Sequence, residues 1–305
     1  PDFKHYFFID GGALGVENAL KAAFDWKAKK LRYSHTVDVN SLDVFHLKNA
    51  FHGRTGYTLS LTNTTPEKTA LFPKFKWTTV EPDWENIESR MHEEVAAIII
   101  EPIQGEGGDN HFPPEFFTNL RRIADENDCL LIFDEVQTGM GATGKMWAYE
   151  HFDTIPDMMC FGKKSQVCGF CSTERIDEVE DNVFHNSGRI NSTWGGNIVD
   201  MVRSRYIIEA IQKYDLLNNA ERVGKHLLWN LRSLPVLDNV RGRGLMIAFD
   251  FPEEYVRDLA MAMLSKNMLV LKCGKKSIRL RPPLTFSIQD AEHAYSFIRK
   301  AVENL

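Results

Sequence analysis

A run of six aliphatic residues, Val95 to Ile100, constrains the fold more than any other part of the sequence. A strand without a polar position is typical of a parallel sheet that is covered on both faces. A helical pattern from Pro114 to Asn127 follows, and then a second apolar run from Leu130 to Phe133. A strand, a helix and a strand at this spacing predict a βαβ unit with parallel strands.

Polar residues follow three of the expected strands at the point where each strand ends. Glu101 opens a glycine-rich segment after the first run, and Asp134 follows the second. A third apolar run, Met158 to Phe161, is followed by Gly162, Lys163 and Lys164. Ligands of open α/β sheets bind beyond the carboxyl ends of the strands. The pattern therefore predicts a functional site at this edge of the sheet.

The chain has 305 residues, which favours one large or two ordinary domains. The pattern changes near residue 205, so we expect an α/β domain with a mostly parallel sheet over residues 1–205 and a smaller α+β domain over 206–305. The elements expected after residue 195 are helices over 197–212, 216–231, 253–266 and 290–302, and strands over 245–249, 268–271 and 277–280.

A helix is predicted near the N-terminus, from Ala13 to Lys30, after a short strand over 6–9. Its apolar positions are expected on one face, with polar positions opposite. The apolar set is Leu14, Leu20, Ala23, Phe24 and Ala28, and the polar set is Glu17, Lys21 and Asp25.

Composition excludes several classes of protein. The net charge is −6, from 36 Lys and Arg against 42 Asp and Glu, which does not suit a nucleic-acid-binding protein. No apolar run approaches the length of a membrane span. Five cysteines at irregular spacing indicate a reducing compartment, and no targeting signal is visible, so we expect a cytoplasmic location. The chain begins without Met inside strongly patterned sequence, and we interpret it as a fragment that starts within a domain.

Two strand-end features have both a structural and a functional interpretation. The Gly11-Gly12-Ala13 turn can bind an anion at the start of a helix, or can simply connect a strand to a helix. Asp134 can cap the following segment, or can pair with a cationic ring nitrogen, because a buried carboxylate requires a cation or hydrogen-bond donors.

The lysine and arginine candidates also have both a structural and a functional interpretation. Lys163 and Lys164 can be solvated, but the apolar residues around them favour partial burial of at least one, which would lower its pKa and suit a Schiff base. Arg54 and Arg281 can be surface charges or can clamp a carboxylate. Cys168 and the cysteine three residues later are interpreted as buried strand residues rather than a redox or metal pair, and no metal site is expected.

Taken together, these segments resemble the class III pyridoxal-phosphate aminotransferases, and they follow the family's order over nearly the whole chain. The resemblance implies the type I fold of pyridoxal-phosphate-dependent transferases, with a large domain and a small C-terminal α+β domain. The segments that carry it are Gly11–Lys21, Ala50–Arg54, Glu101–Gly108, Phe133–Gly139, Phe161–Gly169, Asn191–Gly196 and Arg281–Thr285.

The resemblance also implies residue roles. Lys163 would bind pyridoxal 5′-phosphate covalently and move a proton, and Asp134 would pair with the ring nitrogen. The remaining cofactor contacts would come from Gly12 and Ala13 (phosphate), Phe51 and Val136 (the two faces of the ring), Gln137 (the phenolic oxygen) and Thr193 (the phosphate in the neighbouring subunit of a homodimer). Arg54 would bind the substrate carboxylate, and Arg281 a carboxylate of 2-oxoglutarate, with Glu106 covering Arg281 when lysine is bound.

Within the family, the Gly-Gly-Ala turn, the lysine pair and the segment Gln166–Gly169 favour the branch that acts on L-lysine. The expected reaction transfers the ε-amino group of L-lysine to 2-oxoglutarate and gives 2-aminoadipate 6-semialdehyde and L-glutamate. Ornithine or 4-aminobutyrate is the alternative donor, because a methylene of difference in a pocket is worth only about 1–3 kcal/mol. A non-catalytic anion-binding α/β protein is the alternative of a different class. A nicotinamide dehydrogenase is disfavoured, since the first strand lacks the GxGxxG fingerprint.

Overall fold

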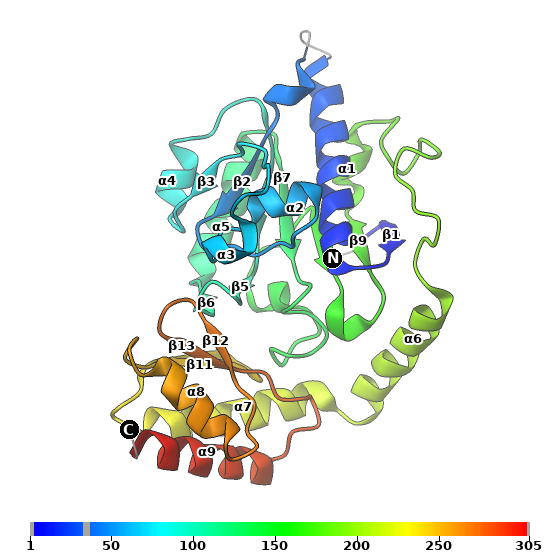
Figure 1. Cartoon of the computed structure of the whole chain (residues 1–305). Helices are drawn as coiled ribbons and strands as arrows, with labels where there is room; N and C mark the ends of the chain where they lie inside the picture. Colours follow the sequence, from blue (N-terminus) through cyan, green and yellow to red (C-terminus); the bar gives the residue numbers. More distant parts are fainter. Residues whose placement is uncertain (1–2, 33–36, 304–305) are drawn as a thin grey trace. The chain divides into compact units, whose positions relative to one another are not determined.

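The computed structural model describes residues 3–32 and 37–303 (Figure 1). Its contacts divide the chain into two compact units. Unit 1 comprises residues 1–102, 112–137 and 149–205, and unit 2 comprises residues 103–111, 138–148 and 206–305. Two short segments from the first half of the chain therefore belong to unit 2. The division of the sequence into 1–205 and 206–305 stays a proposal about how the chain is organised.

A seven-stranded sheet forms the centre of unit 1 within the described residues, in the order β1-β9-β8-β7-β4-β2-β3. All neighbouring pairs from β8 to β3 are parallel, whereas β9 is antiparallel to both β8 and β1. The sheet is therefore mostly parallel, as the sequence predicted. The strands are β1 (His5–Ile9), β2 (Asp43–Leu47), β3 (Thr79–Val80), β4 (Val95–Ile100), β7 (Leu130–Asp134), β8 (Met158–Phe161) and β9 (Cys168–Ser172).

Helices cover both faces of this sheet. Ile132 belongs to the apolar cluster that α1 (Gly12–Arg32) forms with the sheet, whereas its neighbour Phe133 contacts Phe117 of α5 (Pro114–Glu126) with ring centroids 5.7 Å apart. Because successive residues of a strand point to opposite faces, α1 and α5 lie on opposite faces. The fully buried β4 confirms the prediction of a strand that is covered on both sides.

Short helical segments complete unit 1. They are η1 (Val39–Ser41), α2 (Gly56–Leu61), α3 (Pro66–Thr69), α4 (Trp84–Glu88), η3 (Lys163–Ser165) and η4 (Glu174–Glu178). The helix α6 (Ile198–Lys213) contains the boundary between the units in the sequence.

Unit 2 contains an antiparallel sheet in the order β10-β11-β13-β12 and, within the residues described, a two-stranded sheet of β5 and β6. Apolar side chains of its helices and of β11 and β13 form one core cluster. Its elements are β5 (Ile103–Gln104), β6 (Asn110–His111), η2 (Ala148–His151, which crosses into unit 1), α7 (Leu216–Arg232), β10 (Asp238–Arg243), β11 (Met246–Asp250), α8 (Val256–Leu264), β12 (Leu271–Cys273), β13 (Ser277–Leu280) and α9 (Ile288–Glu303).

Three predictions in the C-terminal part were wrong in detail. The strand expected over 268–271 lies instead at β12, because pairing with β13 matches Leu271 to Arg279 and the turn at Gly274 (φ +55°) sets this register. The helix expected over 253–266 is shorter at both ends, because residues 253–255 form a turn whose first carbonyl oxygen, that of Pro252, accepts the amides of Tyr255 and Val256, and the helix ends at Leu264. The strand β10 was not predicted; its sequence is largely polar and glycine-containing.

The predicted faces of α1 also need correction. Leu20 and Ala23 are buried in the core as expected. Phe24 and Ala28, however, line the same cavity as Lys21 and Asp25, on the face that the sequence assigned to polar residues. Asp25 is buried rather than solvated because Lys29 and Arg189 neutralise it.

All five cysteines are buried and unpaired. Cys168 and Cys171 lie in β9, which confirms their interpretation as buried strand residues. Burial raises the pKa of Cys171 to about 12, so its thiol stays protonated and unreactive near neutral pH.

Candidate active site

The carboxyl ends of β4 and β7 and the start of α1 surround a cavity of about 320 Å³ in unit 1. This is the strand edge at which the sequence predicted a site. The lining residues are Gly12, Ala13, Phe51, His52, Gly53, Arg54, Glu101, Asp134, Val136, Gln137 and Lys163. Eight of the residues predicted from the resemblance are thus brought together; Glu106, Thr193 and Arg281 are not among the lining residues.

Asp134 is almost fully buried at the end of β7 and is held from two sides. One carboxylate oxygen lies 2.8 Å from Nδ1 of His52, and the other accepts the amide of Val136 at 3.1 Å. The side chain of His52 is itself completely buried. His52 was missed as a site residue, although the sequence shows it in a glycine-flanked loop near the predicted edge.

The start of α1 offers the anion-binding geometry that the sequence suggested. No acidic side chain lies in its first turn, so the amides there face no negative charge of their own element. A Cβ on Gly12 would lie 2.7 Å from Cγ1 of Val136, and a Cβ on Gly53 (φ +121°) would lie 2.6 Å from Cβ of Ala13. Glycine at both positions lets the backbone close tightly around the cavity.

The two adjacent lysines differ in their surroundings. The ammonium of Lys164, which is half-buried, donates to the carbonyl oxygen of Gln137. The side chain of Lys163 is exposed and lines the cavity, and its ammonium has no hydrogen-bond partner within residues 3–32 and 37–303. The prediction that at least one lysine is partly buried is confirmed for Lys164. A buried setting for Lys163 is not found.

The remaining cavity residues come from the loop after β2 and from the segment after β7. The amide of Phe51 donates to Oε1 of Glu101 at 3.0 Å, which fixes the loop against the end of β4. Arg54, from the same loop, is exposed. Gln137 is half-buried and Val136 buried. Glu101, which the sequence placed at the predicted edge without assigning it a role, also lines the cavity.

Thr193 does not line this cavity. It is an exposed residue of unit 1, in the segment before α6. Its predicted contact with the cofactor of a neighbouring subunit stays a prediction.

Arg281 and Glu106 both belong to unit 2. The guanidinium of Arg281 forms an ion pair with Asp109, which is completely buried, and donates to the carbonyl oxygen of Leu280 at 2.9 Å. The backbone around Asp109 is held by Arg241, which donates to the carbonyl oxygen of Asp109 at 2.9 Å. Glu106 is half-buried, and its carbonyl oxygen accepts the amide of Gly274 at 3.0 Å.

Burial alone would raise the pKa of Asp109, but His111 and Arg281 reverse this effect and lower the pKa. Nε2 of His111 lies 3.4 Å from the carboxylate, close enough for electrostatic attraction but without hydrogen-bond geometry. Asp109 is therefore ionised opposite Arg281. Asp109 was not singled out in the sequence, and its place beside an arginine of interest is visible only in the fold.

The family model for class-III aminotransferases matches residues 1–302, which include all of these positions. The chain belongs to the class-III aminotransferases. Such an enzyme is a pyridoxal-phosphate-dependent transferase, which confirms the predicted family, fold class and cofactor and excludes the non-catalytic alternative.

Two relatives illustrate the similarity. The chain is 46% identical to the L-lysine-epsilon aminotransferase of Mycobacterium tuberculosis, over 99% of this chain and 73% of the relative's length. It is 35% identical to the mitochondrial 4-aminobutyrate aminotransferase of Mus musculus, over 94% of this chain and 65% of that protein. A solved structure, the M. tuberculosis lysine aminotransferase in its internal aldimine form, superposes with a TM-score of 0.93 over 99% of this chain and 75% of that one.

The cavity fits the chemical groups of pyridoxal phosphate. The unshielded amides at the start of α1 suit its phosphate, and the buried carboxylate of Asp134 suits its ring nitrogen. The unpartnered amine of Lys163 suits its aldehyde. In the part of the chain that the structure describes, no helix is long and apolar enough to span a bilayer.

Proposed function

We propose that this class-III aminotransferase transfers the ε-amino group of L-lysine to 2-oxoglutarate in a ping-pong reaction. The products are 2-aminoadipate 6-semialdehyde and L-glutamate. The observation that carries this proposal is the 46% identity to an L-lysine-epsilon aminotransferase over 99% of the chain. The lower identity to a 4-aminobutyrate enzyme makes another ω-amine the alternative donor.

Bound pyridoxal phosphate would act as the electron sink and amino carrier. Nζ of Lys163 would hold the proton that moves during the reaction, since nothing else in the described residues engages this amine. Asp134 would pair with the ring nitrogen, and His52 at 2.8 Å would fix the carboxylate in place. Gly12 and Ala13 would bind the phosphate through backbone amides.

Four further side chains would complete the substrate and cofactor contacts. Phe51 and Val136 would flank the ring, and Gln137 would bind its phenolic oxygen. Arg54 would bind the substrate carboxylate, for which an exposed guanidinium at the cavity is suited.

Arg281 would bind the additional carboxylate of 2-oxoglutarate, with Asp109 holding its guanidinium in place. Glu106 would cover Arg281 when lysine is the substrate. A site that serves both substrates has to offer a positive charge to one and mask it from the other.

We further propose a homodimer in which Thr193 of one subunit reaches the cofactor phosphate of the other, and a cytoplasmic location. The exposure of Thr193 is compatible with such a contact. Sedimentation equilibrium tests the dimer, and a monomer in the cofactor-loaded state would contradict it.

A visible absorption spectrum with pyridoxal phosphate, followed by additions of substrate, tests the reaction. We expect a yellow band that bleaches with L-lysine and returns with 2-oxoglutarate. Bleaching by ornithine or 4-aminobutyrate but not by L-lysine would assign the alternative donor. A yellow band that no amine bleaches would contradict the proposed function.

A further inference from the structure

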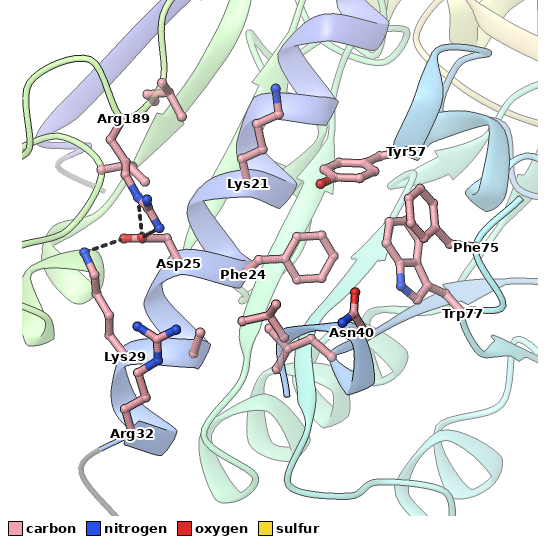
Figure 2. Close-up of a pocket in the computed structure, with 15 residues that line it drawn as sticks. Lys21, Phe24, Asp25, Lys29, Arg32, Asn40, Tyr57, Phe75, Trp77 and Arg189 are labelled. Carbon is pink, nitrogen blue, oxygen red and sulfur yellow. Dashed lines mark hydrogen bonds and ion pairs between the residues drawn. The ribbon is translucent and has the colours of Figure 1, made fainter. Parts of the chain in front are cut away.

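A second cavity, of about 510 Å³, lies in unit 1 (Figure 2). It shares no lining residue with the candidate active site. The volume is within the range of small-molecule sites, about 300–1,000 Å³. Its lining residues are Lys21, Phe24, Asp25, Ala28, Lys29, Arg32, Val39, Asn40, Leu42, Tyr57, Phe75, Trp77, Val183, Arg189 and Ile190.

One face of α1 forms a wall of this cavity. Its contributing positions are 21, 24, 25, 28, 29 and 32, which are spaced by three and four residues and therefore share one helix face. Lys21 lies nine residues after Gly12, or about 13 Å along the helix axis from the candidate active site. The same helix thus begins at one cavity and borders the other with its later turns.

Four aromatic side chains line the cavity, one from α1 and three from the segment that follows β2 in the chain. Phe75 and Trp77 are stacked with ring centroids 4.9 Å apart, and Tyr57 packs edge-on against both, at 5.2 and 5.5 Å. Phe24 of α1 meets Trp77 at 5.3 Å and Tyr57 at 5.7 Å. Phe75 is still 52% exposed, so an aromatic ligand could bury its own ring and further surface of Phe75 by stacking here.

Cations outnumber carboxylates around the cavity. Lys29 and Arg189 both pair with Asp25, at 3.0 and 2.6 Å, and Lys29 also pairs at 3.1 Å with Asp181, which does not line the cavity. Lys21 and Arg32 form no ion pair within residues 3–32 and 37–303. Figure 2 shows the aromatic rings on one side of the cavity and Lys29, Arg32 and Arg189 on the other.

We propose that this cavity is a binding site for a small planar aromatic anion, an aromatic carboxylate or an aromatic phosphate. The ring of such a ligand would stack against Phe75 and Trp77, and its anionic group would meet Lys21 or Arg32. An organic cation could use the aromatic faces but would be repelled by the four cations, which face only Asp25 among the lining residues. The proposal is independent of the proposed transaminase reaction.

Isothermal titration of the cofactor-loaded protein with 2-naphthoate and with adenosine 5′-monophosphate tests this site, with inorganic phosphate as the probe that lacks a ring. We expect one molecule of at least one aromatic probe to bind per chain, and inorganic phosphate to bind far more weakly. Binding of 2-naphthoate alone would assign a carboxylate ligand, and binding of the nucleotide alone a phosphate ligand.

Matched variants locate the binding. Phe75→Ala is expected to weaken binding about fivefold, and the double variant Lys21→Gln with Arg32→Gln about tenfold at low salt. The controls are Phe72→Ala and Lys225→Gln, which remove an exposed ring and an exposed cation that do not line the cavity and should leave affinity unchanged.

Three results would overturn the proposal. They are the failure of both aromatic probes to bind at millimolar concentration, equal affinity in the cavity variants and the wild type, and displacement of the probe by L-lysine or 2-oxoglutarate. The last would place the probe in the active site. A far-ultraviolet circular dichroism spectrum of each variant establishes that a lost affinity does not come from unfolding.

Discussion

At the scale of single residues, the neighbouring lysines differ in their hydrogen bonding. Lys164 is engaged by the carbonyl oxygen of Gln137, whereas the amine of Lys163 lines the cavity and has no partner among the described residues. An amine that attacks an aldehyde has to reach into the cavity that holds the aldehyde. The difference in hydrogen bonding therefore supports Lys163 as the cofactor-binding residue, which the sequence could favour only through the family resemblance.

We expect Lys163→Ala to abolish the yellow band formed with pyridoxal phosphate and to prevent borohydride from trapping the cofactor on the protein. Lys164→Ala should retain both, because it removes only a hydrogen bond to Gln137. Absorbance and mass spectrometry after borohydride reduction measure the two outcomes. A labelled Lys164 in the Lys163→Ala variant, with the yellow band intact, would reverse the assignment.

Asp109 is a second residue whose expected role depends on the side chain with which it pairs. It is completely buried and its closest cation is the guanidinium of Arg281. We expect Asp109→Asn to lower the free energy of unfolding by about 3 kcal/mol, because it leaves a partly buried arginine without its counter-ion. The KM for 2-oxoglutarate should rise several-fold while the lysine half-reaction changes little.

The pH dependence of this effect has a defined sign. The pKa of Asp109 is lowered in the folded protein, so its stabilisation is fully present above the unfolded pKa near 3.9 and is lost as pH falls through the folded value. The difference between wild type and Asp109→Asn in urea unfolding should therefore shrink in strong acid. Asp258→Asn, at an exposed position of α8, is the control. A gap that stays constant with pH would show that the carboxylate charge is not responsible.

At the scale of elements, the shape of the candidate active-site cavity depends on how closely α1 approaches the segment after β7. Gly12 has no room for a Cβ, since Cγ1 of Val136 lies 2.7 Å from the ideal position, and valine is stiff about χ1. We expect Gly12→Ala to destabilise unit 1 by about 1–3 kcal/mol and to weaken cofactor binding. Thermal unfolding and titration with pyridoxal phosphate measure these effects.

Gly56→Ala provides the matched control, because a Cβ there meets only Oε1 of Glu17 at 3.7 Å. Gly56 is the first residue of α2, so alanine there should leave the free energy of unfolding unchanged or raise it by about 0.5–1 kcal/mol. Equal effects of the two substitutions would contradict the argument from close packing.

The elements also show what the sequence could and could not predict. β4, β8 and β13 were predicted with their observed bounds. β4 and β8 are unbroken apolar runs, whereas in β13 two apolar residues alternate with Ser277 and Arg279. β12 was displaced, since strand register depends on the partner strand and on the turn between them. The predicted helix face of Phe24 in α1 was wrong, because the aromatic side chains that it contacts, Tyr57 and Trp77, are remote in sequence.

In the candidate site, too, the sequence predicted features that depend on local pattern and missed those that depend on remote partners. Residues at strand ends, such as Asp134 and Lys163, were predictable because parallel strands bring their carboxyl ends to one edge. His52 and Asp109 were not, since their significance lies in a contact: His52 with Asp134, and Asp109 with Arg281. Local pattern contains no information about such pairings.

At the scale of the whole molecule, one buried histidine gives stability a specific pH dependence. His46 lies in β2, where burial lowers its pKa to about 4. Its usual value near 6.5 applies in the unfolded chain. Below pH 6.5 the unfolded state therefore binds a proton that the folded state does not, and stability falls until the pH reaches about 4.

These two pKa values correspond to a loss of about 2 kcal/mol between pH 7.5 and pH 5. We expect the free energy of unfolding of unit 1, measured in urea, to decrease with acid by about that amount more in the wild type than in His46→Gln. His293→Gln, an exposed change on α9, should follow the wild type, which separates burial from a general effect of losing a histidine. Parallel curves for the wild type and His46→Gln would mean that His46 is protonated in the folded state, and another group would then have to account for any acid sensitivity of the molecule.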